Sequence, residues 1–157
     1  VFNYSWMPLN LHRLVGNVTF GGFVAGLIAD GVHVQRRAIQ LAFTAKGGGG
    51  VALVTDAVAW RAATASAKGI HLRDGAPRLE DGTLAGSALT MDAAVRNCVA
   101  AGVDLADALS AASTTPARVA CAHDRGVIAP GHRADLVALD DRLEVTDVWV
   151  AGRRART

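Results

Sequence analysis

The chain has 157 residues, of which 51% are hydrophobic and 19% are charged, a balance typical of one globular domain and unlike that of a disordered chain. Its 16 basic and 14 acidic residues give a net charge of +2, which argues against a broad basic face for nucleic acid. The longest apolar run, Gly21–Ala29, is about half of the roughly 20 residues that a membrane-spanning helix needs, so we expect no membrane segment.

The two cysteines, Cys98 and Cys121, lie in separate apolar stretches. They match neither a disulfide framework nor a zinc site, and this favours reduced thiols and a cytoplasmic protein. We also expect no secretory leader, because no charged segment is followed by an apolar stretch and a cleavage site. The chain begins with Val1 rather than methionine, so we expect further residues to precede it.

The first predicted elements form a β-α-β unit. Phe23–Ala29 is a continuous apolar run of strand length, typical of a strand buried on both faces. Gln35–Lys46 has apolar residues at helical spacing, and the four glycines at 47–50 end this helix. Val51–Val54 is a second buried-type strand. A strand, a helix and a strand in this order predict two parallel strands.

The middle of the chain interrupts this rhythm. Ala57–Lys68 has no clear period and fits either a weak helix or an irregular segment. Ile70–Asp81 alternates around the turn signals Asp74-Gly75 and Asp81-Gly82, which predicts a hairpin.

Three helices and a small β module complete the prediction. One helix begins after a cap at Thr90 and ends at Gly102, a second covers about Leu105–Ser113, and a third begins at Pro116 behind a cap at Thr115. Two short strands follow, at 134–139 and 145–150, and they are predicted to form part of a β module beside the α/β portion.

Polar residues follow both predicted parallel strands. Asp56 comes after the second strand, where a carboxylate can serve as a general acid or base, although a helix cap or a turn explains it equally well. Asp30 and His33 follow the first strand, and from spacing alone His33 is more often a loop residue than a ligand. The segment 82–91 places two glycines and hydroxyls before a helix, which suits an anion or a sugar hydroxyl but also a simple loop.

The five histidines are scattered and form no metal-binding motif, so the sequence assigns no metal ligand to this chain.

Four segments of the chain carry a family resemblance: Ala29–His33, Leu53–Ala57, Asp81–Met91 and Gly126–Leu139. In this order they resemble the N-acetylglucosamine-6-phosphate deacetylase family of the amidohydrolase superfamily. The last is widespread among amidohydrolases and identifies the superfamily only, whereas the first three together are much more specific. Their order matches the C-terminal part of the family.

The resemblance implies an α/β fold, the C-terminal part of a (β/α)8 TIM-type barrel plus strands of a small β-sandwich. Residues 1–122 would then belong to the barrel and residues 123–157 to the sandwich. Such a barrel needs roughly 250 residues, so we expect this chain to be part of a longer enzyme. The family implies a divalent metal, most often zinc, with ligands on earlier strands outside this chain, and a homodimer when full length.

The resemblance also assigns roles to residues. Asp56 matches the catalytic aspartate, which deprotonates a metal-bound water and then protonates the departing amine. The residues expected to bind the amino-sugar phosphate substrate lie in three segments: Asp30, Gly31, Val32 and His33 in the first, Leu84, Ala85 and Gly86 in the loop that closes over it, and Asn3 and Arg13 near the start of the chain. Arg13 would bind the phosphate, in the site of a neighbouring subunit.

The implied reaction is hydrolysis of the N-acetyl group of N-acetylglucosamine 6-phosphate, with this chain inactive by itself. Two alternatives remain: another amidohydrolase, similar to dihydroorotases or aminoacylases, and a non-catalytic remnant.

Overall fold

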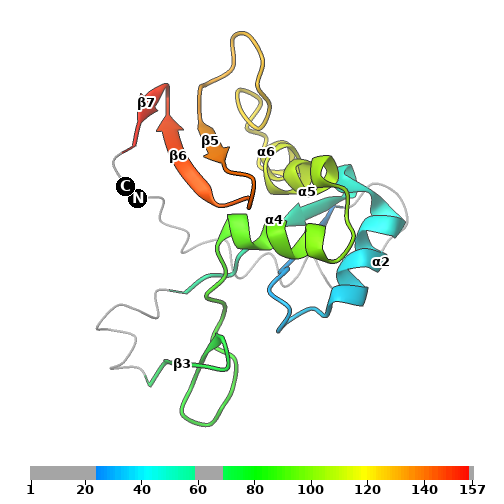
Figure 1. The fold of residues 1–157 in the computed structure, drawn as a ribbon, viewed down its shortest axis with the longest axis vertical. Coiled ribbons are helices and arrows are strands. Elements are labelled where there is room, and N and C mark those ends of the chain that lie inside the picture. The colour runs from blue at the N-terminus through cyan, green and yellow to red at the C-terminus, as the bar shows by residue number, and fades with distance from the viewer. Residues whose placement is uncertain (1–23, 59–68, 156–157) are drawn as a thin grey trace.

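A computed structural model of the chain describes residues 24–58 and 69–155 (Figure 1). The predicted β-α-β unit is confirmed by two parallel strands in which Leu27 lies opposite Leu53. Its elements are β1 (Ala25–Leu27), α2 (Arg36–Lys46), the short 3-10 helix η1 (Gly48–Gly50) and β2 (Val51–Leu53). Both strands are shorter than predicted, because only three residues of each take part in the pairing.

The hydrophobic core surrounds these two strands. All three residues of β2 are buried, as expected for a strand covered on both faces. Helix α2 contributes Ile39 and Phe43, four residues apart on one helical face. Two further helices close the core, α4 (Met91–Ala100) and α5 (Leu105–Ala112), whose buried residues include Val95 and Ala108.

The α4 and α5 helices begin as the sequence predicts, but their caps differ. Thr90 occupies the cap position of α4 without a capping hydrogen bond from its side chain. Asp104 caps α5, because its side chain accepts a hydrogen bond from the N–H of Ala106 at 2.8 Å. Gly102, which follows α4, has a φ of +89°, a conformation that glycine adopts without strain.

The prediction for the third helix is wrong at its start. Helix α6 covers Thr114–Val119 with Ser113 at its cap position, so Thr115 lies inside the helix rather than capping it. Thr115 is 1% exposed, and its hydroxyl donates to the carbonyl oxygen of Gly48 at 2.9 Å. A long-range hydrogen bond to η1 therefore uses the hydroxyl that sequence reasoning gave to a local cap.

The hairpin projects from the body of the molecule (Figure 1). Its strands are β3 (His71–Arg73) and β4 (Ala76–Arg78), paired antiparallel. The connecting residues Asp74 and Gly75 have φ values of +51° and +77°, as a two-residue turn of type I′ requires. The second predicted turn is also present, since the N–H of Gly82 donates to the carbonyl oxygen of Leu79 at 3.0 Å.

The C-terminal strands form a separate antiparallel sheet. It consists of β5 (Leu136–Leu139), β6 (Val145–Val150) and β7 (Arg153–Arg154), and β7 was not predicted. Arg96 of α4 donates to the carbonyl oxygen of Leu143 at 2.7 Å and so connects this sheet to the helices.

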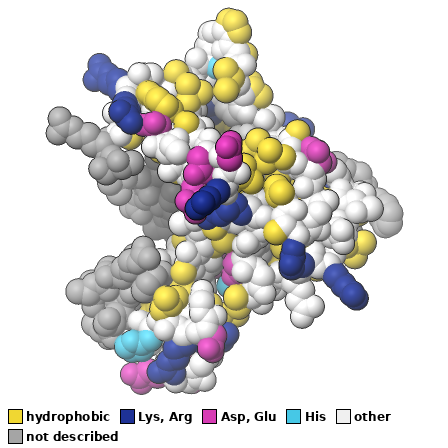
Figure 2. Space-filling model, viewed as in Figure 1, with side chains coloured by type: hydrophobic (Ala, Val, Ile, Leu, Met, Phe, Trp, Pro, Cys, Tyr) yellow, Lys and Arg dark blue, Asp and Glu magenta, His cyan; other side chains and the backbone are white. Residues whose placement is uncertain are grey.

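Charged side chains stand at separate places on the face shown in Figure 2, several of them beside opposite charges. Arg96 pairs with Asp92 at 2.8 Å, and Arg125 pairs with Asp124 at 2.8 Å. None of the helices in the two described ranges combines the length and apolar character needed to cross a lipid bilayer.

Candidate active site at the ends of the parallel strands

The pairing of β1 and β2 places two carboxylates at equivalent positions. Leu27 lies opposite Leu53, and the N–H of Val54 continues the ladder by donating to the carbonyl oxygen of Leu27 at 3.0 Å. Asp30 and Asp56 each come three residues after these two leucines, beyond the ends of the strands. Because the strands are parallel, both residues emerge beyond the same edge of the sheet, where α/β proteins bind their ligands.

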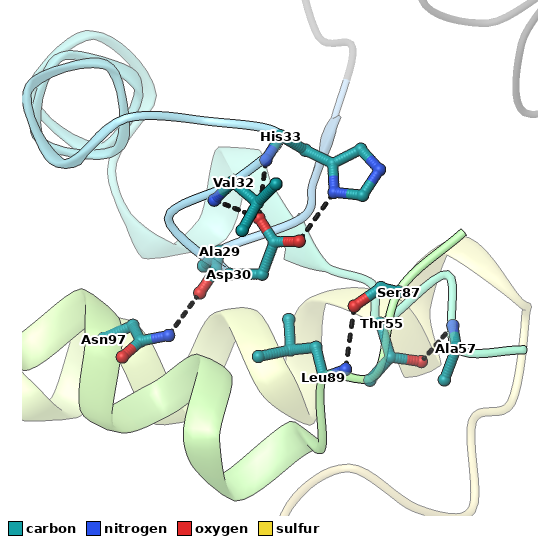
Figure 3. A network of polar contacts seen from close by, with 9 residues as sticks. All are labelled: Ala29, Asp30, Val32, His33, Thr55, Ala57, Ser87, Leu89 and Asn97. Carbon is teal, nitrogen blue, oxygen red and sulfur yellow. Dashed lines mark hydrogen bonds and ion pairs between the residues drawn. The ribbon is translucent and has the colours of Figure 1, made fainter. Parts of the chain in front are cut away.

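The turn that follows β1 is organised by Asp30 (Figure 3). Its Oδ1 accepts hydrogen bonds from the N–H groups of Val32 at 2.9 Å and His33 at 2.8 Å, and its Oδ2 lies 2.6 Å from Nδ1 of His33. Burial would raise the pKa of Asp30, but the hydrogen bonds from His33 and Val32 together lower it below its ordinary value. Asp30 is therefore a half-buried, ionised acceptor, while Gly31 and Val32 are exposed.

Asn97 fixes the end of β1 from the side of α4. Its amide Nδ2 donates to the carbonyl oxygen of Ala29 at 2.8 Å, across 68 residues of sequence (Figure 3). Sequence reasoning missed Asn97. One signal in the sequence could have found it. Asn97 is a polar residue that lies next to Cys98 and three residues after Ala94, which are both buried, and it therefore borders the apolar face of α4.

Asp56 is exposed and its backbone is unusual. Its φ is +48°, a left-handed conformation that side-chain-bearing residues seldom adopt. Two backbone hydrogen bonds hold it there: the N–H of Ser87 donates to the carbonyl oxygen of Asp56 at 2.8 Å, and the N–H of Val58 donates to that of Ser87 at 3.0 Å. A non-glycine residue held in such a conformation is typical of functional sites.

Gly86 permits this close approach. A Cβ atom at Gly86 would lie 2.5 Å from Cγ1 of Val58 and 3.0 Å from the carbonyl oxygen of Asp56, and its φ of +110° also favours glycine. The two segments that sequence reasoning singled out, around Asp56 and around Gly86, are thus in direct contact.

The rest of the 82–91 segment contacts the hairpin and forms a local hydrogen bond at Ser87. Ala85 donates its N–H to the carbonyl oxygen of Pro77 at 2.9 Å, and Leu84 forms a bridge with Arg78. Ser87 is 1% exposed, and its hydroxyl accepts the N–H of Leu89 at 2.8 Å (Figure 3). Leu84, Ala85 and Gly86 are half-buried, and Asn3 and Arg13 lie outside the described residues.

Residues 24–58 and 69–155 bring no three histidine, cysteine or acidic side chains together in a way that could hold a metal ion. Burial raises the pKa of the Cys98 thiol to about 11, so this thiol is protonated and unsuited to metal binding. Cys121 is exposed and forms no disulfide bond within the described residues.

The parallel strands and the strand-end carboxylates agree with what comparison with known proteins shows: the chain belongs to the amidohydrolase family, whose pattern matches residues 11–155. Within that family it is similar to deacetylases of amino-sugar phosphates. The N-acetylgalactosamine-6-phosphate deacetylase of Escherichia coli O157:H7 is 39% identical over 82% of this chain and 36% of its own length. The N-acetylglucosamine-6-phosphate deacetylase of Lysinibacillus sphaericus is 31% identical over 96% of this chain and 41% of its own length.

A solved structure supports the same relationship. The crystal structure of the N-acetylglucosamine-6-phosphate deacetylase of Pasteurella multocida matches with a TM-score of 0.78 and 30% identity, over 88% of this chain and 38% of that protein. The resemblance seen in the sequence is confirmed by these relatives, and the chain spans about two fifths of their length.

Proposed function

We propose that this chain is the C-terminal part of an enzyme that hydrolyses the acetamide of N-acetylglucosamine 6-phosphate, giving glucosamine 6-phosphate and acetate. The observation that carries the proposal is the equivalent placement of Asp30 and Asp56 beyond neighbouring parallel strands. The similarity to deacetylases over most of the chain supports the choice of reaction.

Asp56 is proposed as the catalytic residue. In the reaction, a water oxygen bonds to the acetyl carbon and the bond from that carbon to nitrogen breaks. The Asp56 carboxylate takes a proton from the water and delivers it to the departing amine, so that Asp56 ends the reaction in the ionised form in which it began. Its exposure and the fixed backbone next to Ser87 suit such a proton carrier.

The substrate-binding residues are proposed from the same two strand ends. Gly31, Val32 and His33 lie in the turn that Asp30 organises. Gly86 lies against the backbone of Asp56, and Leu84 and Ala85 directly precede it. Asn3 and Arg13 are proposed to extend this site, with Arg13 contacting the phosphate of a neighbouring subunit in a homodimer.

The architecture is proposed as the last strands of a (β/α)8 barrel in residues 1–122 and part of a β-sandwich in residues 123–157. Two observations support it. All three residues of β2 are buried, as in an interior barrel strand, and β5 and β6 place Val137, Val148 and Val150 on one face of the small sheet. Val137 and Val150 are exposed, so further strands could pack there.

A divalent metal, zinc in the first instance, is proposed for the longer enzyme. The residues described here do not form a ligand set, so no ligand is assigned to this chain and no step is derived through the metal. The cytoplasm is proposed as the location, on the basis of the two unpaired cysteines.

The test is release of acetate from N-acetylglucosamine 6-phosphate and from its galactosamine epimer, with added zinc. It compares this chain with a longer protein that includes the preceding reading frame. We expect activity in the longer protein and a loss of about 100-fold or more in kcat for Asp56→Asn. Asp74→Asn is the matched control, because Asp74 is also exposed with a φ of +51° but lies in the hairpin turn.

Each other outcome has a distinct meaning. A preference for the galactosamine epimer would correct the substrate but keep the reaction. Inactivity of the longer protein on both sugars would favour another amidohydrolase or a non-catalytic remnant. Full activity of Asp56→Asn would contradict the role of Asp56.

A further inference from the structure

The carboxylate of Asp30 is fully engaged within its own turn. Oδ1 accepts two backbone N–H groups, from Val32 and His33, and Oδ2 lies 2.6 Å from the His33 ring. An ionised carboxylate can only accept hydrogen bonds. The hydrogen in the contact with the ring must therefore be on Nδ1 of His33. Asp30 has little capacity left to bind a substrate directly, since its side chain is 9% exposed.

The other ring nitrogen of His33, Nε2, is the atom of this pair that remains available to a ligand. In a neutral imidazole with hydrogen on Nδ1, Nε2 carries a lone pair and accepts hydrogen bonds. Within the described part of the chain, Nε2 makes no hydrogen bond, and in Figure 3 it points away from Asp30. The His33 side chain is 20% exposed, so Nε2 is accessible at the strand ends.

The turn that carries this pair is anchored from behind. Asn97 donates to the carbonyl oxygen of Ala29, the residue directly before Asp30. The Asp30 carboxylate is thus held by the backbone N–H groups of its own turn, and helix α4 holds the backbone of the residue before it. A carboxylate fixed in this way orients the imidazole and selects its tautomer, as outer partners do for ligand histidines.

We propose that Asp30 is a positioning residue that holds neutral His33 in its Nδ1–H form, so that Nε2 accepts a hydrogen bond from a hydroxyl group of the sugar substrate. The identity of the hydroxyl donor rests on the proposed function, whereas the tautomer does not. Asp30 thereby acts on substrate binding through His33 rather than by touching the sugar.

The first test is nuclear magnetic resonance of the 15N-labelled chain at a pH above the ordinary histidine range. Long-range proton–nitrogen correlations distinguish the two tautomers of a neutral imidazole, and His33→Gln identifies the His33 signals by their disappearance. We expect the Nδ1–H form in the unmodified chain. A predominant Nε2–H form would overturn the proposal without any variant having to fold.

The Asp30→Asn variant should reverse the tautomer. If its Oδ1 keeps the two backbone bonds, its amide nitrogen replaces Oδ2 and donates to Nδ1, which moves the hydrogen to Nε2. Asp140→Asn is the matched control: Oδ1 of Asp140 also accepts two backbone N–H groups, from Arg142 and Glu144 at 2.9 Å each. No histidine contacts Asp140 in the described residues, so the His33 spectrum should not change in that variant. An unchanged spectrum in a folded Asp30→Asn variant would contradict the proposal.

A double-mutant cycle in the longer enzyme tests the substrate part. Asp30→Asn should raise KM about 3- to 10-fold with little change in kcat, the fold-change of one lost hydrogen bond. The side chain in His33→Gln offers an acceptor that needs no tautomer selection, so Asp30→Asn should add nothing to KM in that background. Equal effects in both backgrounds would show that Asp30 acts independently of His33. If the longer protein is inactive on both sugars, the proposed function fails while the tautomer measurement still decides the role of Asp30.

Discussion

The α/β part and the C-terminal sheet are stabilised in different ways. In the described residues, every buried hydrophobic side chain lies between Leu27 and Ala111, and nearly all of them pack around β1, β2 and the helices. The residues of β5, β6 and β7 are all half-buried or exposed. The sheet is held instead by its backbone ladder and by surface contacts such as the pair Arg154–Asp147. Burial therefore dominates one region and hydrogen bonding the other.

This difference indicates which region of the chain needs further protein packed against it to be stable. The α/β part excludes water from its own core, whereas the sheet touches it mainly through Leu143 and the bond from Arg96. We infer that the small sheet contributes little free energy of folding in this chain and gains stability when its exposed valines are covered.

The largest expected difference in stability is between leucine-to-alanine substitutions made in the two regions. Leu53→Ala in β2 should lower the free energy of unfolding by about 2 to 5 kcal/mol, because Leu53 is 2% exposed and leaves a cavity. Leu139→Ala in β5 should cost about 1 kcal/mol, since a half-buried site loses less contact. Urea denaturation followed by circular dichroism measures both. Equal losses would break the comparison.

A smaller effect is expected where backbone packs against backbone. Gly48→Ala places a Cβ atom 2.6 Å from Oδ1 and 2.8 Å from Cα of Asp107, which should cost about 1 to 3 kcal/mol of unfolding free energy. Gly49→Ala is the control, because nothing lies within 4 Å of its added Cβ. A shift of the thermal midpoint in the Gly48 variant alone would sharpen the view that η1 is packed tightly against α5.

Acid should weaken the α/β part through Asp30. The folded-state pKa of Asp30 lies below 3.8, so the unfolded chain binds more protons as the pH falls. The stability due to Asp30 is present above about pH 5 and is lost as the pH drops through the folded-state pKa. Urea midpoints measured between pH 6 and pH 3 should therefore fall less in Asp30→Asn than in the unmodified chain. An equal fall in both would contradict this contribution.

The smallest effect is expected in the sheet. Arg154→Ala removes the contact with Asp147 and should change the free energy of unfolding by at most about 1 kcal/mol, because the arginine side chain is 70% exposed. High salt should have a similarly small effect on the unmodified chain. A loss of more than about 2 kcal/mol in chemical denaturation would show that the sheet depends on this ion pair after all.

The sequence was sufficient to predict the elements that local patterns determine. The period of α2, the buried run of β2 and the Asp74-Gly75 turn are each set by residues close together in the chain, and all three are present. The parallel pairing of β1 with β2 followed from their order. The resemblance to deacetylases came from motifs whose order in the chain is visible without a structure.

Long-range contacts account for what sequence reasoning missed. Thr115 looked like a cap because its partner, Gly48, is 67 residues away. Asn97 was not singled out because its partner, Ala29, is 68 residues away. Neither partner can be identified from local composition. Strand β7 was missed for a different reason: Arg153 and Arg154 have no strand pattern, although they pair with the neighbouring strand β6 across a short turn.

The register of β1 against β2 also has a consequence for anyone who redesigns this protein. The alignment of Leu27 with Leu53 determines the spacing between the backbone positions of Asp30 and Asp56. A slip by one residue would move one carboxylate by about 3.3 Å and turn the strand's side chains to the opposite face. A graft of this site onto another scaffold must therefore transfer the strand pair intact.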